Sequence, residues 1–284
     1  MEPLSAITIK ELLENHDFRF SKSKGQNFLT DANIPEKIVR LSGIDKGCGV
    51  LEIGPGAGAL TSHLSSAAGY VVAVELDRKL AEILSEAAAA AGNVEIVQGD
   101  ILKQDIRELT AVKMPGLRLF ACANLPYSIT TPALTTLVNA GVFESITIMV
   151  QREVAQRLCA SEGTADYGAI SVFVQYHSQP RILFDVPPQC FVPMPKVYSS
   201  VVTLDMRRGK LLSPEREAVF FQVVRAAFGQ RRKTLVNALF SAFGSSLSKQ
   251  EISVAVQKCG FAPDVRGEVL GVQDFIRLTE HFAL

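Results

Sequence analysis

The chain has 284 residues, of which 48% are hydrophobic and 20% charged, a composition typical of an ordinary folded protein and not of one with long disordered tails. Its 29 basic and 29 acidic residues cancel, so total charge does not indicate a nucleic-acid partner, although residues 201–284 carry 12 basic and 8 acidic side chains. The five cysteines form no C-x-x-C pair, and no apolar run approaches the roughly 20 residues that cross a bilayer. With no secretion signal visible, we expect a cytoplasmic protein without disulfides, bound metal or membrane partner.

Apolar, β-branched segments alternate with helix-like segments in the first half of the chain. Strand–helix–strand alternation predicts βαβ units, a mainly parallel sheet and helices on both of its faces. The predicted strands are 48–54, 70–76, 94–98, 117–123 and 145–150, and the first two are followed by predicted helices at 58–68 and 77–92.

The pattern changes after residue 150. We expect a helix over 151–160 and a closing pair of strands at 182–186 and 199–206, whereas 170–177 fits a helix or a strand equally well. Beyond Met206 the segments are helical, with Ser213 and Pro214 starting one helix and Ser248 and Glu251 forming the capping box of another. We therefore expect an α/β domain at 1–206 and a small all-helical domain at 207–284.

A glycine-rich turn, LEIGPGAG, connects the first predicted strand to the first helix. Its glycines allow a sharp turn and close approach of a ligand. Gly54, Gly56 and Ala59 also satisfy the dinucleotide pattern G-x-G-x-x-[GA], with Glu75 at the separation expected for a ribose contact. A plain structural turn, a nicotinamide site and another adenosine-bearing ligand all remain open at this point.

Two acidic residues lie at the carboxyl ends of the next two strands: Glu75 at the end of the second, and Asp100 just after the third. Glu75 can accept hydrogen bonds from ribose hydroxyls, and Asp100 can accept one from an exocyclic adenine amine while Ile101 packs on the ring. Each acid has a structural alternative, since both precede predicted helical segments that they could cap. Together with the glycine turn they favour an adenosine-bearing ligand.

The stretch Ala123-Asn124-Leu125-Pro126-Tyr127 follows the fourth strand. The amide oxygen of Asn124 and the carbonyl of Leu125 could each accept a hydrogen from a planar amine, which frees the nitrogen lone pair to attack an electrophilic methyl group. Pro126 stiffens the turn, and Tyr127 offers a face for a base, where stacking contributes about 1–3 kcal/mol. This chemistry depends on positioning and electrostatics.

These motifs resemble those of the ribosomal RNA adenine N6,N6-dimethyltransferases. The resemblance rests on SKGQNFL, LEIGPGAGALT, GDIL, NLPY, QREVAQRL, FVPMPKVYSSVV and FGQRRKTLVNAL, in that order. It implies a Rossmann-like class I methyltransferase with a seven-stranded sheet, S-adenosylmethionine (SAM) as methyl donor, and two adjacent adenosines near the 3′ end of 16S rRNA in the 30S particle as substrate. It also implies a slot for the target base between Tyr127 and Phe191. The implied SAM contacts are Asn27, Leu29, Gly54, Glu75, Asp100 and Asn124.

A basic cluster, Arg231, Arg232 and Lys233, lies at the start of a predicted helix in the C-terminal domain. Such a run is often a solvated surface, and cations are disfavoured at a helix N-terminus. We nevertheless expect these residues, with Lys24, to contact RNA phosphates, which position a substrate without reading its sequence. We expect a monomer, since no sustained coiled-coil pattern is present.

Four other functions remain open. Large-subunit rRNA methylation and DNA adenine methylation would use the same NLPY chemistry. A nicotinamide dehydrogenase would leave NLPY unexplained, and a ribosome-assembly factor would need binding without catalysis.

Overall fold

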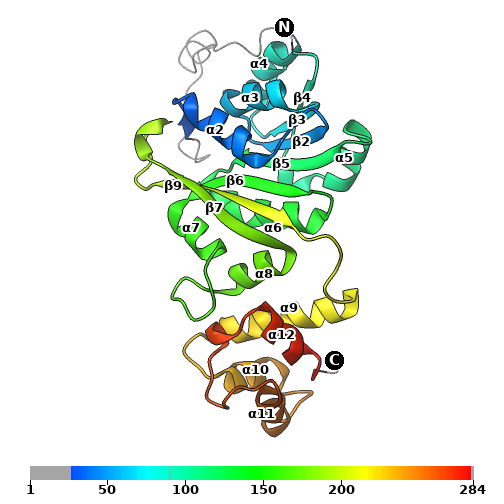
Figure 1. Ribbon diagram of the computed structural model, residues 1–284, viewed down its shortest axis with the longest axis vertical. Coiled ribbons are helices and arrows are strands. Elements are labelled where there is room, and N and C mark those ends of the chain that lie inside the picture. Colours follow the sequence, from blue (N-terminus) through cyan, green and yellow to red (C-terminus); the bar gives the residue numbers. More distant parts are fainter. Residues whose placement is uncertain (1–26, 90, 283–284) are drawn as a thin grey trace. The chain divides into compact units, whose positions relative to one another are not determined.

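The computed structural model of the protein describes residues 27–89 and 91–282 (Figure 1), which form two compact units. The first unit comprises 27–155 and 181–206, and the second 156–180 and 207–282. The second unit thus includes a segment, 156–180, that the sequence analysis placed in the larger domain.

A seven-stranded sheet forms the centre of the first unit. Its strands lie in the order β4 (Val94–Gln98), β3 (Tyr70–Glu75), β2 (Cys48–Ile53), β5 (Arg118–Asn124), β6 (Ser145–Gln151), β9 (Ser199–Met206) and β7 (Ser178–Val186). The first five are parallel to one another, and β9 runs antiparallel to β6. All six residues of β2 are buried, as expected for the centre of a sheet covered on both faces. The expectation of a mainly parallel sheet is confirmed.

Helices connect these strands. The unit contains α2 (Asn33–Ser42), α3 (Ala59–Ala67), α4 (Arg78–Ala89), α5 (Ile106–Lys113), α6 (Thr130–Ala140) and the start of α7 (Arg152–Leu158). Successive strands move outward from β2 through β3 to β4, and then in the opposite direction through β5 to β6. Because such crossovers are right-handed, the two directions place their helices on opposite faces of the sheet. The carboxyl ends of β2, β3, β4 and β5 therefore share one edge.

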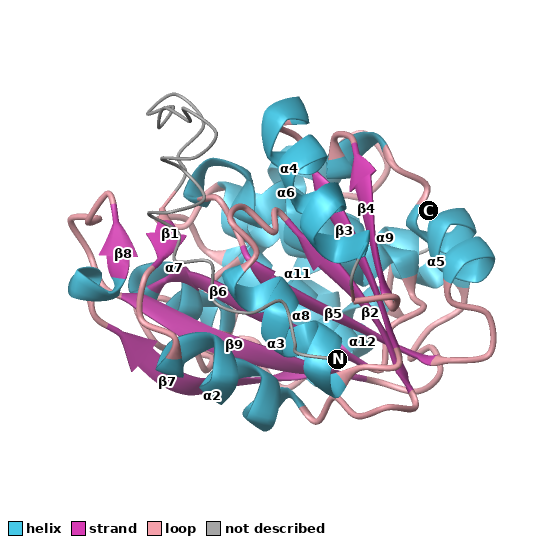
Figure 2. Ribbon diagram, turned by 90° about the horizontal axis from the view of Figure 1, so that it is seen from above, coloured by secondary structure: helices cyan, strands magenta, loops and turns pink. Residues whose placement is uncertain are grey.

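A two-stranded ribbon stands beside the main sheet. Its strands are β1 (Phe28–Leu29) and β8 (Phe191–Val192), and Figure 2 shows them side by side. They pair antiparallel, with Leu29 opposite Phe191. This pairing holds the start of the described chain near the end of β5, to which it is not adjacent in sequence.

The second unit is helical. It contains α8 (Ala169–His177), α9 (Pro214–Gly229), α10 (Leu235–Phe243), α11 (Lys249–Lys258) and α12 (Val272–Thr279). Tyr167, Val172 and Tyr176 are buried among apolar side chains of α9 to α12, such as Phe220 and Phe275. This packing explains why 156–180 groups with the C-terminal helices, and it resolves 170–177 as a helix.

Helix caps in this unit match the sequence signals. The side chain of Ser213 accepts a hydrogen bond from the backbone N–H of Arg216, and Pro214 is the first residue of α9. Ser248 and Glu251 form the capping box of α11. Both caps satisfy backbone donors that a helix otherwise leaves without partners. Within the described parts of the chain, no helix is long and apolar enough to cross a membrane.

Candidate active site

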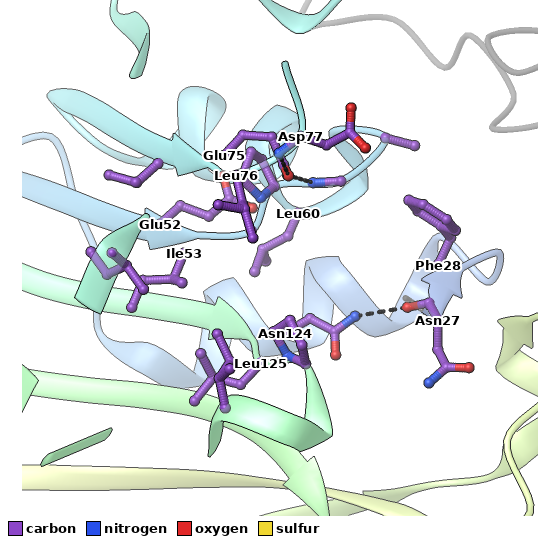
Figure 3. A pocket seen from close by; sticks show the side chains of 18 of the residues that line it. Asn27, Phe28, Glu52, Ile53, Leu60, Glu75, Leu76, Asp77, Asn124 and Leu125 are labelled. Carbon is purple, nitrogen blue, oxygen red and sulfur yellow. Dashed lines mark hydrogen bonds between the residues drawn. The ribbon is translucent and has the colours of Figure 1, made fainter. Parts of the chain in front are cut away.

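A cavity opens at the carboxyl edge of β2, β3, β4 and β5 (Figure 3). Parallel α/β sheets bind ligands at this edge, where the strand order changes direction. Twelve residues singled out from the sequence line the cavity: Asn27, Leu29, Gly54, Gly56, Ala59, Glu75, Asp100, Ile101, Asn124, Leu125, Pro126 and Tyr127. The fold thus brings together residues that are spread over about a hundred positions of the chain.

The glycine turn between β2 and α3 has a backbone that other residues rarely adopt. Gly54, Gly56 and Gly58 have φ values of 64°, 59° and 82°. A Cβ atom on Gly56 would lie 3.0 Å from the ring of Phe28, and one on Gly58 would lie 2.9 Å from Leu84. The turn therefore needs glycine for its conformation and for the close packing around it.

Glu75 ends β3 with its carboxylate buried against this turn. One oxygen, Oε1, accepts a hydrogen bond from the backbone N–H of Asp77 at 2.8 Å, and Oε2 accepts one from Gly56 at 3.2 Å (Figure 3). Burial raises the pKa of the Glu75 carboxyl, and these two N–H groups oppose the increase. Each carboxylate oxygen has a further lone pair, so this structural role leaves Glu75 able to accept hydrogen bonds from a ligand.

Asp100 combines a capping hydrogen bond with a position at the cavity. Its Oδ1 accepts a hydrogen bond from the backbone N–H of Leu102 at 3.0 Å, which caps the short 3-10 turn Ile101–Lys103. Asp100 lines the cavity together with the buried Ile101. The helix-capping alternative is correct for Asp100, and it is compatible with a contact to a ligand.

Asn124 is held at the end of β5 by the segment that precedes β1. Its Nδ2 donates a hydrogen bond to the backbone carbonyl of Asn27 at 3.1 Å (Figure 3). This contact orients the amide group and leaves Oδ1 as the acceptor. The next residue, Leu125, is buried and donates its backbone N–H to the carbonyl of Met149 at 3.2 Å.

Tyr127 follows the proline turn and is half-buried at the cavity. Its hydroxyl lies 2.8 Å from Oγ of the buried Ser199 on β9, in a hydrogen bond that either group can donate. Burial raises the pKa of Tyr127, so the phenol stays protonated at neutral pH. Ser199, which the sequence analysis did not single out, therefore holds the Tyr127 ring in place.

Phe191 does not line the cavity with Tyr127. It is 2% exposed and packs in the core of the first unit, against a group of apolar side chains that includes Leu29 and Val201. Pairing of β8 with β1 places the Phe191 ring in this core. The expected slot between Tyr127 and Phe191 is therefore not formed in this structure. Phe191 is instead a core residue, as is common for an aromatic beside a proline turn.

The basic cluster lies in the turn before α10, not in its first turn, because Thr234 is the N-cap. Nη2 of Arg231 donates hydrogen bonds to the backbone carbonyls of Ala165 and Tyr167, at 3.1 and 2.9 Å. Arg231 thus has a structural role that the sequence analysis did not foresee. Arg232 and Lys233 are exposed. Lys24 lies outside the described residues.

Glu52 is the main residue that the sequence analysis missed. This acid, the last residue but one of β2, lines the cavity and is 1% exposed. A charged residue inside an otherwise apolar strand, LEIG, is the signal that could have identified it. Among residues 27–89 and 91–282, no cluster of three or more His, Cys, Asp or Glu is arranged to hold a metal ion.

The model of one protein family, described as ribosomal RNA adenine dimethylase, matches residues 17–281. The chain belongs to this family. Membership agrees with the resemblance seen in the motifs and extends it to the C-terminal helices. It removes the nicotinamide dehydrogenase alternative that the glycine pattern had left open.

Full-length relatives and solved structures agree with this family. Proteins named ribosomal RNA small subunit methyltransferase A are 43% identical: that of Alkaliphilus oremlandii over 96% of both chains, and that of Streptococcus agalactiae over 95% of this chain and 94% of its own. A dimethyladenosine transferase from Plasmodium falciparum is 24% identical, with a TM-score of 0.74 over 88% of this chain and 95% of its own. The 23S rRNA methyltransferase ErmE is also 24% identical, with a TM-score of 0.69 over 90% of this chain and 99% of its own. These two structures show the shared fold, and the expected Rossmann-like methyltransferase fold with a helical C-terminal region is confirmed.

Proposed function

We propose that this protein transfers methyl groups from SAM to the N6 amines of two adjacent adenosines near the 3′ end of 16S rRNA in the 30S particle or its precursor. Family membership supports the reaction, and the names of the 43%-identical relatives support the small subunit as the target. The observation that carries the proposal is the Asn124 amide, oriented by Asn27 at the cavity that Glu75 and Asp100 also line. A place in ribosome biogenesis, and hence in the cytoplasm, follows from this substrate.

The cavity fits the chemical groups of SAM. Asp100 and Ile101 offer an acceptor and an apolar surface for adenine, and the free lone pairs of Glu75 suit the ribose hydroxyls. The backbone of the glycine turn, with no side chain at Gly56, leaves room for the rest of the molecule. When bound, SAM supplies a methyl group on a positively charged sulfur.

Asn124 and Leu125 activate the adenine amine. The N6 nitrogen is a weak nucleophile because its lone pair is delocalised into the ring. Oδ1 of Asn124 and the carbonyl of Leu125 accept the amine hydrogens, which draws the nitrogen toward tetrahedral geometry and localises the lone pair. Since the Asn27 carbonyl holds Nδ2, the amide presents its oxygen without needing to reorient.

Tyr127 supplies the stacking surface for the base. An adenine must leave its own stack to reach the cavity, and stacking on an aromatic ring offsets part of that cost. The hydrogen bond to Ser199 keeps the Tyr127 ring in one position. Because Phe191 is buried, the structure offers one stacking wall, and a second would require movement of β8.

The second unit contributes phosphate contacts through Arg232 and Lys233. Both are exposed in the turn before α10, where they avoid the unfavourable positive end of that helix. Contacts to phosphates add affinity that depends on salt and does not read sequence. We expect the double variant R232A/K233A to bind 30S particles more weakly and with a smaller salt dependence.

The deciding experiment is a methyl-transfer assay with labelled SAM on immature 30S particles, followed by mass spectrometry of the 16S rRNA. Dimethylation of two neighbouring adenosines is expected, with Asn124→Ala as the inactive control. Label in large-subunit rRNA or duplex DNA instead would identify a different substrate. Full restoration of ribosome assembly in cells by Asn124→Ala would show that binding matters more than catalysis.

A further inference from the structure

An exposed tyrosine lies at the edge of the sheet where β6 ends and β9 begins. Tyr198 is 45% exposed, although the next residue, Ser199, is fully buried. The antiparallel pairing of β6 with β9 ends where Gln151 lies opposite Ser199. The backbone N–H of Arg152 then donates a hydrogen bond to the carbonyl of Tyr198 at 2.9 Å. This bond extends the pairing by one residue, so the backbone fixes the place from which the exposed ring projects.

The guanidinium group of Arg152 lies over the ring of Tyr198. Its Cζ is 5.7 Å from the ring centroid, within the roughly 6 Å at which an aromatic face attracts a cation. Nη1 of Arg152 is 3.9 Å from Oδ2 of Asp185, whose Oδ1 accepts a hydrogen bond from Ser200 at 2.6 Å. Because 3.9 Å is too long for a hydrogen bond, Asp185 attracts the guanidinium without using its N–H groups. Tyr198 and Arg152 thus form an aromatic and cationic surface that is about half exposed.

This surface begins one residue away from the group that positions Tyr127. Oγ of Ser199 and the hydroxyl of Tyr127 are 2.8 Å apart. Consecutive Cα atoms are about 3.8 Å apart, so the backbone of Tyr198 lies next to the contact that holds the Tyr127 ring. Tyr198 does not itself line the cavity, so it is not placed to receive the target base. A planar group stacked on Tyr198 would instead lie just outside the cavity.

The loop before Tyr198 indicates which kind of partner this surface fits. Val192, Met194 and Val197 are between 42% and 66% exposed, and Lys196 is exposed among them. Exposed apolar side chains that gather in one segment mark a contact surface. Single-stranded nucleic acid stacks its bases on aromatic rings and places its phosphates against cations, and the loop offers both. Because the loop borders the cavity at which an RNA adenine is expected, RNA is the partner that these features favour.

We propose that Tyr198, together with Arg152, stacks the adenosine adjacent to the one that is being methylated. The assignment rests on the proposed function, which supplies two neighbouring adenosines as the substrate. While the N6 amine of one base is at Asn124, the neighbouring base remains attached by a single phosphodiester and needs a place outside the cavity. Tyr198 gives this base a ring that replaces the stack lost when the target flips out, and Lys196 offers a cation to the phosphate. The second adenosine is thereby held close to the cavity for its own methylation.

A coupling experiment between the protein and the RNA tests this contact. 30S particles are reconstituted with 16S rRNA in which one of the two adenosines is an abasic nucleotide, and methylation of the other is measured at saturating SAM. On intact particles, Tyr198→Ala should raise the KM for 30S roughly 5- to 150-fold, the factor that stacking of one base on an aromatic side chain contributes. On particles that lack the neighbouring base, wild type and Tyr198→Ala should have the same KM, because no stacked base remains to be lost.

Both abasic positions are tested, and the one that shows this coupling identifies the base that Tyr198 holds. An equal loss from Tyr198→Ala on intact particles and on both abasic particles would overturn the assignment. The surface would then contact a ribosomal protein or another part of the RNA.

Matched variants separate this contact from general effects on charge and folding. Arg181 forms an exposed ion pair with Asp205 at the amino end of β6, the opposite edge of the sheet. Arg152→Gln should raise the KM for 30S particles and reduce its salt dependence, whereas Arg181→Gln should behave as wild type. The conservative variant Tyr198→Phe keeps the ring and should recover the affinity lost in Tyr198→Ala. Tyr198→Ala should keep the SAM affinity of the wild type, since Tyr198 does not line the cavity, and this separates a lost RNA contact from misfolding.

The two proposals fail differently. If the wild-type protein methylates neither adenosine, the proposed function fails and the role of Tyr198 falls with it. If the wild type dimethylates intact 30S particles but Tyr198→Ala has an unchanged KM or shows no coupling, only the assignment of Tyr198 is wrong.

Discussion

Replacing Glu52 by glutamine should make the ligand-free protein more stable, and increasingly so as pH rises. In the unfolded chain the Glu52 carboxyl ionises near 4.5, whereas in the folded protein its pKa is about 8. Between these values the folded state holds one proton more than the unfolded state. The free energy of unfolding therefore falls by about 1.4 kcal/mol per pH unit, on the order of 5 kcal/mol in all. Stability from the protonated acid is fully present below pH 4.5 and has been lost once pH exceeds about 8.

Glutamine keeps the size and the hydrogen-bonding end of the protonated acid but does not titrate. Between pH 5.5 and 7.5 the stability advantage of Glu52→Gln over wild type should grow by about 3 kcal/mol. Urea unfolding followed by circular dichroism at several pH values measures this difference, and the contributions of other titrating groups cancel between the two proteins. The surface control Glu86→Gln should change stability by less than about 0.5 kcal/mol at every pH. Parallel pH profiles for wild type and Glu52→Gln would refute the reasoning, because they would mean that burial does not hold the proton on Glu52.

Three further predictions concern single contacts. Phe191→Ala should lower the free energy of unfolding, measured in denaturant titrations, by about 3–5 kcal/mol, because removing the ring leaves a cavity in the core. A change below about 1 kcal/mol would contradict the burial of this ring. Arg231→Ala should destabilise the protein by about 1–3 kcal/mol, since it removes the donor to two backbone carbonyls. Arg232→Ala, at an exposed position, should change the free energy of unfolding by less than about 0.5 kcal/mol and should weaken binding to 30S particles in filter-binding assays. Tyr127→Phe keeps the stacking face and loses only the contact to Ser199, so methyl transfer should continue at a reduced rate; complete inactivity would show that the hydroxyl itself is needed for the chemistry.

Local patterns in the sequence were sufficient to locate most of the cavity. Glu75, Asp100 and Asn124 each lie at the end of an apolar strand or just after it. The carboxyl ends of parallel strands share one edge, so the proximity of these residues follows from periodicity and topology. The glycine turn was predictable for a similar reason, because Gly54 and Gly56 adopt positive φ values that few other residues tolerate.

Contacts between distant segments could not be predicted in this way. Whether Arg231 contacts solvent or the carbonyls of Ala165 and Tyr167 depends on how the segment before α8 packs with the C-terminal helices. The same packing decides that 170–177 is a helix, since its apolar pattern suits either structure and only its neighbours distinguish them.

The sequence by itself determined the kind of fold, the edge of the sheet at which the cavity lies and the Asn124 amide that lines it, because these depend on residue type and short-range spacing. Only the tertiary structure decided which way the Asn124 amide faces, since its partner Asn27 lies 97 residues away. The tertiary structure likewise placed Phe191 in the core and buried Glu52 at a cavity whose lining, in the part of the chain that the structure describes, includes no Lys, Arg or His. Burial and electrostatic environment are properties of the assembled chain, and no pattern of neighbouring residues specifies them.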